Sequence, residues 1–285
     1  MILLNQMPKY IDIHSHVNFK AFKEDADAVI ERALNNNTWV INVGSQFSTS
    51  KRAVEIANKY KEGVFAIVGL HPIHLEESYH DDEEIGGEGF MTRVEEFDKD
   101  AYRELLKDPK VVGIGECGLD YFHMKGDTVE KQKKVFREQV SLAQETGKAL
   151  MLHVRNNPKN MEVNAYTDTL EILKEFPGIK GDVHFFAGSL EDAKNFNDIG
   201  FTVSFTGVIT FTHDYDEVIK SVPLNMIMAD TDCPYVAPVP YRGKRNEPVY
   251  VKEIVKKIAE IKNLPEPEVA EAIVQNARRI FNLPL

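Results

Sequence analysis

Several short apolar segments, far apart in this chain, run directly into a histidine, a glutamate or an aspartate. The residues that end these segments are His14 and His16, Glu116, His153, His184, and Asp230 with Asp232. Apolar runs rich in β-branched residues and too short for helices predict buried strands. Burying an imidazole or a carboxylate at a strand end costs free energy unless something pairs with it, and a metal ion is a strong partner. The pattern therefore predicts strand ends that converge on one metal site.

Eight β-like runs alternate with helix-like stretches along the 285 residues. The runs cover residues 10–16, 38–44, 64–70, 110–116, 149–153, 179–184, 201–205 and 225–230. Such alternation, at this length, is typical of a (β/α)8 TIM barrel. An open doubly wound sheet is the alternative. The barrel is favoured because only a closed sheet places the first and last strands side by side and gathers all the candidate ligands at one mouth.

Helical patterns occupy the intervals between several of these runs. They cover residues 24–35, 128–146, 168–176 and 190–198, and two more lie within 247–281. Gly147 stands where the second helix would stop, and Ser189 stands where an N-cap would precede the fourth. No linker rich in glycine, serine or proline divides the chain, so we predict a single domain over residues 1–285.

Composition excludes several classes of protein. A formal net charge of −11 argues against wrapping nucleic acid on a basic surface, although metal ions could supply local positive charge. No apolar run is long enough to span a membrane, and the N-terminus does not read as a signal peptide. Cys117 and Cys233 are too few for a disulfide framework. We expect a cytoplasmic protein without an obligate protein partner, either a monomer or a weak oligomer.

The candidate metal ligands form a mixed set of imidazoles and carboxylates. They are His14, His16, Glu116, His153, His184 and Asp232. His14 and His16 are two residues apart, so a strand presents both on one face. Imidazole ligands favour Zn²⁺ or Mn²⁺ over Mg²⁺, without excluding Mg²⁺. Six ligands are too many for one tetrahedral ion and suit two divalent ions about 3.5–4 Å apart, with Glu116 as the bridge.

Further motifs surround these ligands, and together they match a known family. The matching segments are residues 12–16, 69–72, 115–121, 153–155, 184–189, 230–235 and 238–248. With them the chain resembles, from residue 10 to residue 283, the TatD family of metal-dependent deoxyribonucleases, within the amidohydrolase-like barrels. The resemblance implies a barrel that binds divalent metal through the six positions above. It also implies hydrolysis of phosphodiesters, often as a 3′–5′ exonuclease.

The chain departs from the family pattern at four places. Asp230 stands where a longer glutamate is usual, and Phe185 replaces a common cysteine. An acidic, glycine-containing insertion covers residues 76–89, and a second insertion covers residues 156–166. Both insertions follow strands at the predicted mouth, where they would shape substrate access. The acidic insertion is interpreted as a solvated loop, with a lid over the mouth as the alternative.

The resulting hypothesis is a divalent-metal-dependent hydrolase of phosphodiesters, a 3′–5′ deoxyribonuclease on DNA ends that uses a metal-activated water. Asp232 would ligate one ion and take the proton from that water, while Glu116 bridges the ions. His71 would bind substrate or protonate the leaving group, or it would only fix the turn that follows it. Arg155 and Arg242 are candidate phosphate contacts, or else salt-bridge partners of the acidic surface.

Two other functions compete with this hypothesis. An amidohydrolase-type enzyme would cleave a small ester, lactone or amide on the same site. Related barrels often use a carboxylated lysine as the bridge, but Glu116 ends the fourth predicted strand, and no lysine ends the fourth or fifth. A catalytically silent binding protein is the third hypothesis. The intact ligand set argues against it, because buried carboxylates and imidazoles without an ion would be a needless cost.

Overall fold

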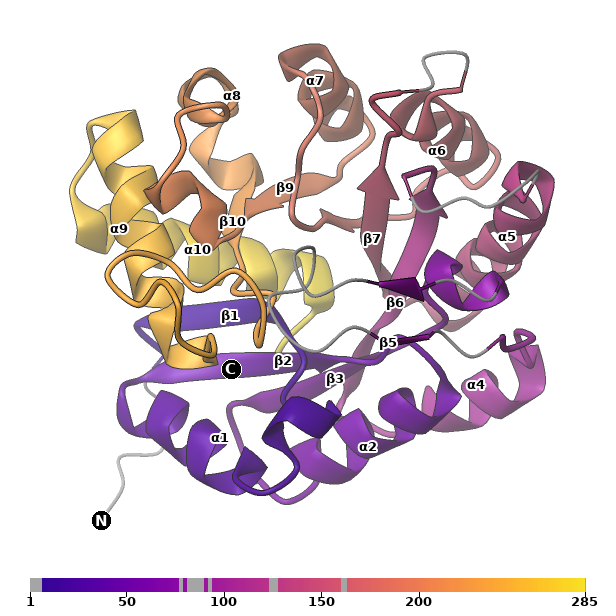
Figure 1. The fold of residues 1–285 in the computed structure, drawn as a ribbon, viewed down its shortest axis with the longest axis horizontal. Helices are drawn as coiled ribbons and strands as arrows, with labels where there is room; N and C mark the ends of the chain where they lie inside the picture. Colours follow the sequence, from indigo (N-terminus) through magenta and orange to yellow (C-terminus); the bar gives the residue numbers. More distant parts are fainter. Residues whose placement is uncertain are drawn as a thin grey trace.

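Eight parallel strands form one continuous sheet in the computed structural model, which describes residues 7–76, 79–80, 90–91, 94–122, 128–159 and 163–284 (Figure 1). In sheet order the strands are β1 (Tyr10–Ser15), β2 (Thr38–Val43), β3 (Val64–Val68), β6 (Val111–Asp120), β7 (Ala149–Arg155), β8 (Gly181–Val183), β9 (Thr202–Phe205) and β10 (Ile227–Ala229). All eight follow one another in chain order. The predicted (β/α)8 TIM barrel is thereby confirmed.

The barrel is nearly closed by contacts between its first and last strands. Ser15 forms an isolated parallel bridge with Cys233, whose carbonyl accepts a hydrogen bond from the His16 amide at 2.9 Å. The amide of Asp232 in turn donates to the carbonyl of His14 at 3.0 Å. The seam therefore runs through the residues that were predicted as ligands, and it brings His14 and His16 beside Asp232.

A buried side-chain pair reinforces the same seam. Both oxygens of Asp12 accept hydrogen bonds from Thr231, one from its amide at 2.9 Å and one from its hydroxyl at 2.6 Å. Neither side chain is exposed to solvent. Burial raises the pKa of Asp12 well above its ordinary value, and the hydroxyl of Thr231 opposes that rise. Because this carboxyl has no contact with solvent, it depends on its protein donors, which are Thr231 and, at 3.4 Å, the amide of His14.

Helices cover the outside of the sheet. They are α1 (Ala26–Asn35), α2 (Phe47–Ala57), α4 (Lys99–Leu105), α5 (Val129–Thr146), α6 (Ala165–Lys174), α7 (Leu190–Asp198), α8 (Asp216–Ser221), α9 (Val251–Lys262) and α10 (Glu266–Phe281). Short 3-10 helices are η1 (Lys20–Phe22), η2 (Pro72–Leu75), η3 (Gly207–Thr210), η4 (Leu224–Met226) and η5 (Pro248–Tyr250). The Ser189 hydroxyl caps α7, and Gly147 ends α5 with φ of 66°, as the sequence predicts.

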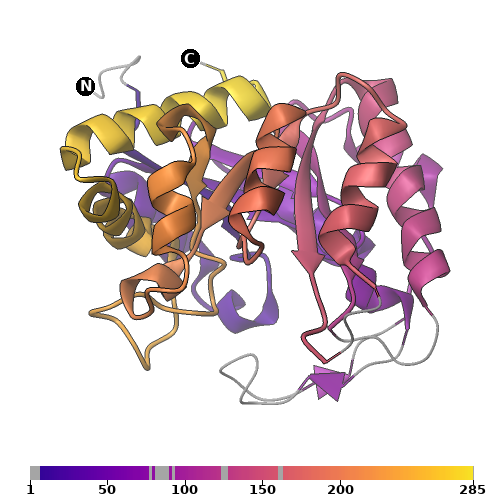
Figure 2. The same ribbon diagram turned by 90° about the horizontal axis from the view of Figure 1, so that it is seen from above.

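Helix α10 lies across the end of the barrel where the strands begin (Figure 2). Asn276 donates hydrogen bonds to the carbonyls of Leu224 and Ile227, next to the start of β10. The Tyr10 hydroxyl at the start of β1 donates to Glu266 at the start of α10. With this end covered, the loops that follow the strands form the mouth at the opposite end, where barrel enzymes carry their sites.

The sequence misjudged some element boundaries. Strand β6 continues four residues beyond Glu116, so Glu116 lies inside the strand, next to an irregularity in its pairing with β7. Helix α6 begins at Ala165 rather than at 168, because the Asn164 side chain accepts hydrogen bonds from the amides of Tyr166 and Thr167.

Two insertions and one hairpin complete the comparison with the sequence. The hairpin of β4 (Tyr79–His80) and β5 (Phe90–Met91) was not predicted. Residues 77–78 and 81–89 of the acidic insertion, and residues 160–162 of the other, lie outside the described residues. Among the described helices, none combines the length and the apolar character needed to cross a membrane.

We expect Thr231→Val to lower the free energy of unfolding by about 1–3 kcal/mol, because a buried carboxyl of Asp12 loses its donor. The matched control is Thr169→Val in α6, whose buried hydroxyl has no hydrogen-bond partner among the described residues. That change should be neutral or stabilising. Urea unfolding of both variants measures the difference. Equal losses in the two variants would contradict a special role for the Asp12–Thr231 pair.

Candidate metal centre

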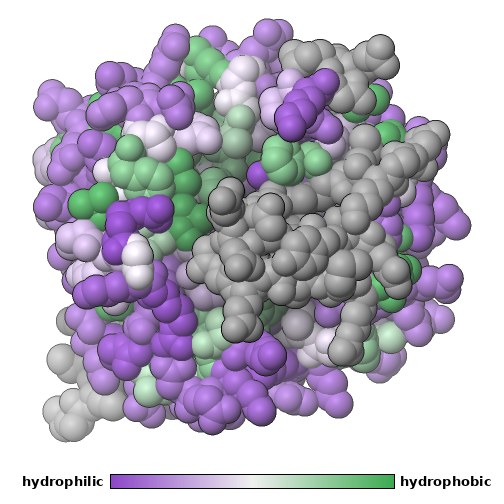
Figure 3. All heavy atoms as spheres, viewed as in Figure 1, coloured by the Kyte–Doolittle hydropathy of each residue, from purple (hydrophilic) through white to green (hydrophobic). Residues whose placement is uncertain are grey.

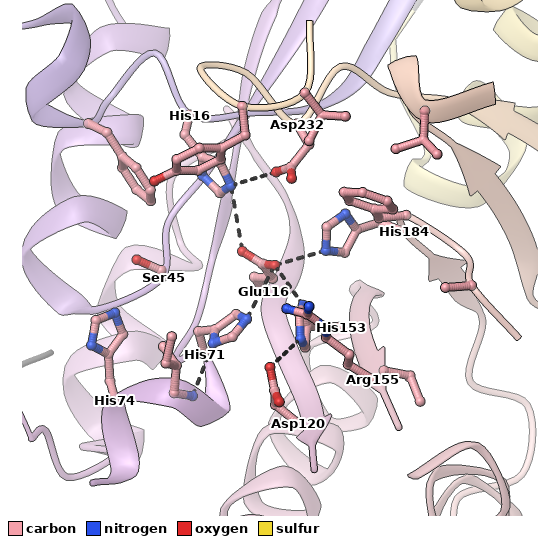
Figure 4. A pocket seen from close by; sticks show the side chains of 18 of the residues that line it. His16, Ser45, His71, His74, Glu116, Asp120, His153, Arg155, His184 and Asp232 are labelled. Carbon is pink, nitrogen blue, oxygen red and sulfur yellow. Dashed lines mark hydrogen bonds and ion pairs between the residues drawn. The ribbon is translucent and has the colours of Figure 1, made fainter. Parts of the chain in front are cut away.

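The carboxylate of Glu116 lies at the centre of the barrel mouth, and its two oxygens face different histidines (Figure 4). Oε2 lies 3.6 Å from Nε2 of His14 and 3.6 Å from Nε2 of His16. Oε1 lies 2.8 Å from Nε2 of His184 and 3.2 Å from Nδ1 of His153. One buried carboxylate therefore touches side chains from β1, β7 and the loop after β8.

On the Oε2 side, the ring nitrogens of the His-x-His pair converge. Nε2 of His14 and Nε2 of His16 are only 3.1 Å apart, and Oδ1 of Asp232 lies 3.3 Å from the latter. Nδ1 of His16 donates to the carbonyl of Val43 at 2.9 Å. In a neutral ring this bond leaves the lone pair on Nε2, where it points at the other candidate ligands. A cation between these atoms satisfies all of them.

On the Oε1 side, a carboxylate orients His153. Nε2 of this ring donates to Asp120 at 2.9 Å, and Nδ1 lies 3.2 Å from Oε1 of Glu116. When the ring is protonated, Nδ1 donates to Glu116; when the ring is neutral, Nδ1 carries a lone pair that a cation can bind. A ligand histidine whose other nitrogen donates to a carboxylate is a common arrangement at metal sites. Asp120 lies within the motif of residues 115–121, but nothing in the sequence spacing links it to His153.

His71 also faces the carboxylate of Glu116, but it does so as a hydrogen-bond donor. Its Nδ1 accepts a hydrogen bond from the amide of Ile73 at 3.0 Å, so the proton of the neutral ring is on Nε2. That Nε2 lies 3.4 Å from Oε1 of Glu116. Burial lowers the pKa of His71, which keeps the ring neutral. His71 therefore presents an N–H donor to the mouth rather than a lone pair.

The electrostatics of the cluster suit a cation. Burial alone would raise the pKa of Glu116, but the imidazoles of His71, His184 and His14 lower it well below its ordinary value. Burial, together with the neighbouring ring of His184, lowers the pKa of His14 to about 3. Burial opposes protonation of His153, yet hydrogen bonds to Asp120 and Glu116 raise its pKa to about 9. The site thus holds an ionised carboxylate beside a neutral His14.

Three groups of ligand-type atoms each lie within 4.8 Å of one another. They are His14 with His184 and Asp232, His14 with His16 and Glu116, and His71 with Glu116 and His153. In the described part of the chain, Nδ1 of His14 and Nδ1 of His184 are buried without a hydrogen-bond partner. Mixed nitrogen and oxygen donors at this density fit divalent transition metals. The structure brings all six predicted ligands to one place, together with His71, which the sequence also indicated, and Asp120, which contacts His153.

A second layer of buried carboxyls lies beneath the ligands. The Ser204 hydroxyl is 2.7 Å from Asp182 and 2.5 Å from Asp230. One hydroxyl hydrogen cannot serve both contacts, so one of the two carboxyls is protonated and donates. Burial raises the pKa of Asp182 to about 7 and that of Asp230 to about 6. The sequence indicated neither Asp182 nor Ser204, because a single polar residue inside a strand is ordinary.

A cavity of about 460 Å³ opens above the candidate ligands. Arg155 lines it, with its guanidinium 3.9 Å from the ring centre of Phe122. Arg242 does not line it. Its guanidinium stacks on Phe211 at 4.1 Å and donates to the carbonyl of Ala237. Of the two predicted phosphate contacts, the structure therefore brings only Arg155 to the site.

Two cysteines adjoin candidate ligands. Cys117 and Cys233 follow Glu116 and Asp232, and both are fully buried. Burial raises the pKa of each thiol. A thiol that stays protonated is a poor nucleophile, which agrees with a packing role.

Left-handed backbone conformations mark the same cavity. Six described residues other than glycine have positive φ, and three of them are asparagines, which tolerate it. The other three are Phe185 (45°), Asp232 (50°) and Val236 (48°), and all three line the cavity. Such conformations cost on the order of 1–3 kcal/mol each and cluster at functional sites. The strained backbone conformations therefore lie at the same cavity as the candidate ligands.

Comparison with known proteins agrees with this geometry. The family model described as TatD related DNase matches residues 11–282. The chain belongs to the TatD family. A relative from Bacillus subtilis, the uncharacterized metal-dependent hydrolase YabD, is 35% identical over 277 residues, which cover 95% of this chain and 98% of YabD. This TatD protein is accordingly a metal-dependent hydrolase.

More distant relatives support the same conclusion. The uncharacterized metal-dependent hydrolase MJ1582 of Methanocaldococcus jannaschii is 27% identical, and the match covers 96% of this chain and 97% of MJ1582. Among solved structures, the TatD homologue YjjV of Escherichia coli K12 is 27% identical, with a TM-score of 0.80. The match covers 98% of this chain and all of YjjV. The family resemblance seen in the sequence is thereby confirmed.

Divalent metal should stabilise the fold, because it binds the assembled cluster and not the unfolded chain. At a free Mn²⁺ concentration 100 times Kd, we expect a gain of about 2.7 kcal/mol over chelated protein. Glu116→Gln should lose most of this gain, since an amide cannot offer two anionic oxygens. An Asp198→Asn control on exposed α7 should keep it. Thermal unfolding with Mn²⁺ and with chelator measures both. An unchanged shift in Glu116→Gln would contradict the central place of Glu116.

Proposed function

We propose that this TatD protein is a phosphodiesterase that removes nucleotides from the 3′ ends of DNA. The observation that carries the proposal is that the two carboxylate oxygens of Glu116 face different ligand-type side chains. A carboxylate shared in this way suits two divalent ions, the arrangement used for in-line displacement at phosphorus. The match to the family model described as TatD related DNase supports the same substrate class.

The residues proposed to hold the ions divide into two groups around Glu116. His14 and His16 face Oε2 of Glu116, with Asp232 beside them, and His153 and His184 face Oε1, while His184 also lies close to His14 and Asp232. Zn²⁺, Mn²⁺ and Mg²⁺ are the candidates, and the many imidazoles favour the first two. When bound, such ions lower the pKa of the attacking water and neutralise charge on the phosphoryl oxygens.

Three side chains of this protein are proposed to act on the substrate. Asp232 takes the proton of the attacking water, because its carboxylate faces the cavity and its side chain is 13% exposed. His71 donates from Nε2 to the leaving oxygen, since its other nitrogen is held by the amide of Ile73. Arg155 lines the cavity and offers a forked donor to the phosphate. Together they supply a base, a donor and an anion contact.

An amidohydrolase of a small ester, lactone or amide is the competing function. No lysine is found among the described residues that line the cavity, and Glu116 lies at the central position, which argues against it. Rates with bis(p-nitrophenyl) phosphate, p-nitrophenyl acetate and a panel of lactones separate the two. Faster turnover of a lactone than of the phosphodiester would favour the amidohydrolase.

Asp232→Asn should lose at least about a hundredfold in rate, because the base is removed while the fold is kept. The measurement uses Mn²⁺-loaded protein with 3′- and 5′-labelled single-stranded DNA. We expect stepwise shortening from the 3′ end by the wild-type protein and by an Asp198→Asn control. Shortening from the 5′ end would contradict the proposed polarity. A near-normal rate in Asp232→Asn would rule out its role as base.

The variant His71→Ala tests whether His71 is a hydrogen-bond donor to the substrate or a metal ligand. We expect the rate on DNA to fall by about 10²–10⁴-fold, with the bound Mn²⁺ per chain unchanged, because the Nε2 proton is no longer available. His153→Ala should instead lose bound Mn²⁺, since its Nδ1 faces Glu116. Metal content by elemental analysis accompanies each rate. If His71→Ala also loses Mn²⁺, His71 is a ligand. If its rate is normal, His71 only fixes its turn.

A further inference from the structure

The cavity above the candidate metal centre has two kinds of wall. Toward β3, β6 and β7 the lining includes the polar side chains of His71, Asp120 and Arg155, with Ile73 and Val154 beside them. Toward β8, β9 and β10 it is lined by Phe185, Val208, Tyr215, Tyr235 and Val236, which we call the apolar wall. On the mouth side of the molecule, hydrophobic side chains gather over the segments labelled α8 and β10 in Figure 1 (Figure 3). A substrate at the centre therefore meets charge on one side and apolar surface on the other.

The apolar wall adjoins the candidate ligands directly. Phe185 follows His184 in the chain, and their ring centroids are 6.4 Å apart. Val236 comes four residues after Asp232, in the loop that crosses the end of β10. Gly207 allows this loop to approach η3, since a Cβ there would lie 2.3 Å from the carbonyl of Val236. A group bonded to a phosphate at the centre falls within reach of this wall.

Two residues of the apolar wall carry side chains where the backbone favours glycine. Phe185 and Val236 have positive φ, and a β-branched valine is especially disfavoured there. Glycine adopts the same backbone without strain. Both side chains are only partly buried, so the hydrophobic core does not require them. Residues that adopt a disfavoured backbone conformation without a gain in packing are expected at functional sites.

The shape and chemistry of the wall define what it holds. A cavity of about 460 Å³ is in the lower part of the usual range for small ligands, about 300–1,000 Å³, and suits one nucleotide-sized group. Phe185, Val208 and Val236 offer no side-chain hydrogen bonds, so they do not read the edges of a base. Apolar and aromatic surfaces bind bases through their faces, which works for every base. Arg155 on the opposite side favours an anionic substrate over a neutral ester.

We propose that the apolar wall is a nucleobase subsite, in which Phe185, Val208 and Val236 hold the unpaired base of the nucleotide being released. The subsite rests on the proposed phosphodiesterase activity, and it would make that activity selective for substrates that carry a nucleobase. It recognises the nucleoside rather than the phosphate alone. A base stacked inside a duplex cannot enter it, because its neighbours cover the faces that the wall would contact.

The test compares two esters that share one leaving group. Thymidine 5′-p-nitrophenyl phosphate carries a base, and methyl p-nitrophenyl phosphate does not. With Mn²⁺-loaded wild-type protein we expect kcat/KM to be at least about tenfold higher for the thymidine ester, the size of a typical stacking contribution. In Phe185→Gly and in Val236→Gly this ratio should fall at least about threefold. The ratio cancels losses that affect both esters.

Stability distinguishes a subsite from a structural role. Because glycine relieves the left-handed strain, neither variant should unfold at a lower temperature than the wild type. Val239→Gly is the matched control, since Val239 belongs to the same loop, is 45% exposed and does not line the cavity. It should keep the wild-type ratio. Val208→Ala provides a third variant that leaves the backbone conformation alone.

The outcomes separate the subsite from the activity on which it rests. Hydrolysis of both esters at equal kcat/KM would overturn the nucleobase subsite and leave the phosphodiesterase intact. A wild-type ratio that persists in Phe185→Gly, Val236→Gly and Val208→Ala would also overturn it. If neither ester is hydrolysed and DNA is not shortened, the phosphodiesterase itself is wrong, and the subsite is wrong with it.

Discussion

The structure depends on the interaction between one buried carboxylate and the imidazoles around it. Glu116 is 6% exposed, lies inside β6, and is surrounded by His14, His153 and His184 from three other parts of the barrel. An ionised carboxylate in this position is tolerable only because positive or polarisable partners surround it. The ring nitrogens that face Glu116 are also the atoms through which imidazoles bind metal ions, so the side chains that stabilise one buried charge also form a place for a cation.

Barrel closure is the second requirement, because it decides which residues become neighbours. The seam between β1 and β10 brings Asp232 beside His14 and His16, although more than 200 residues separate them. An open sheet would leave these residues at opposite edges. The Asp12–Thr231 pair lies at the same seam, so one set of buried hydrogen bonds holds both the fold and the candidate centre together.

Much of this arrangement could be predicted from the sequence, because strand ends carry a strong signal. Short apolar runs that end in histidine or a carboxylate predicted the barrel, and they predicted that the six candidate ligands lie close together. Glu116 was misplaced at a strand end, since pairing with β7 extends β6 through an irregularity that has no sequence pattern. Arg242 was expected at the site because arginine suits phosphate, but its stacking on Phe211 is a tertiary contact that only the fold reveals.

The features that the sequence did not indicate share a physical cause. Asp120 and Ser204 act through side-chain hydrogen bonds between neighbouring strands, and such bonds have no periodicity to detect. The apolar wall escaped notice because Phe185 and Val236 read as ordinary apolar residues. Their left-handed backbone follows from the loops that carry them. Hydrogen-bond partners and unusual backbone angles are therefore visible only after the fold is known.

Because the seam joins the first strand to the last, the barrel and the candidate metal centre are completed only late in the synthesis of the chain. A nascent polypeptide that has left the ribosome only as far as β9 already holds His14, His16, Glu116, His153 and His184, but it lacks Asp232 and the residues that close the barrel. Helix α10, which braces β1 and β10 from below, is made later still. Five of the six candidate ligands are therefore made before Asp232. A cation bound before Asp232 is made would therefore be held by an incomplete set of ligands.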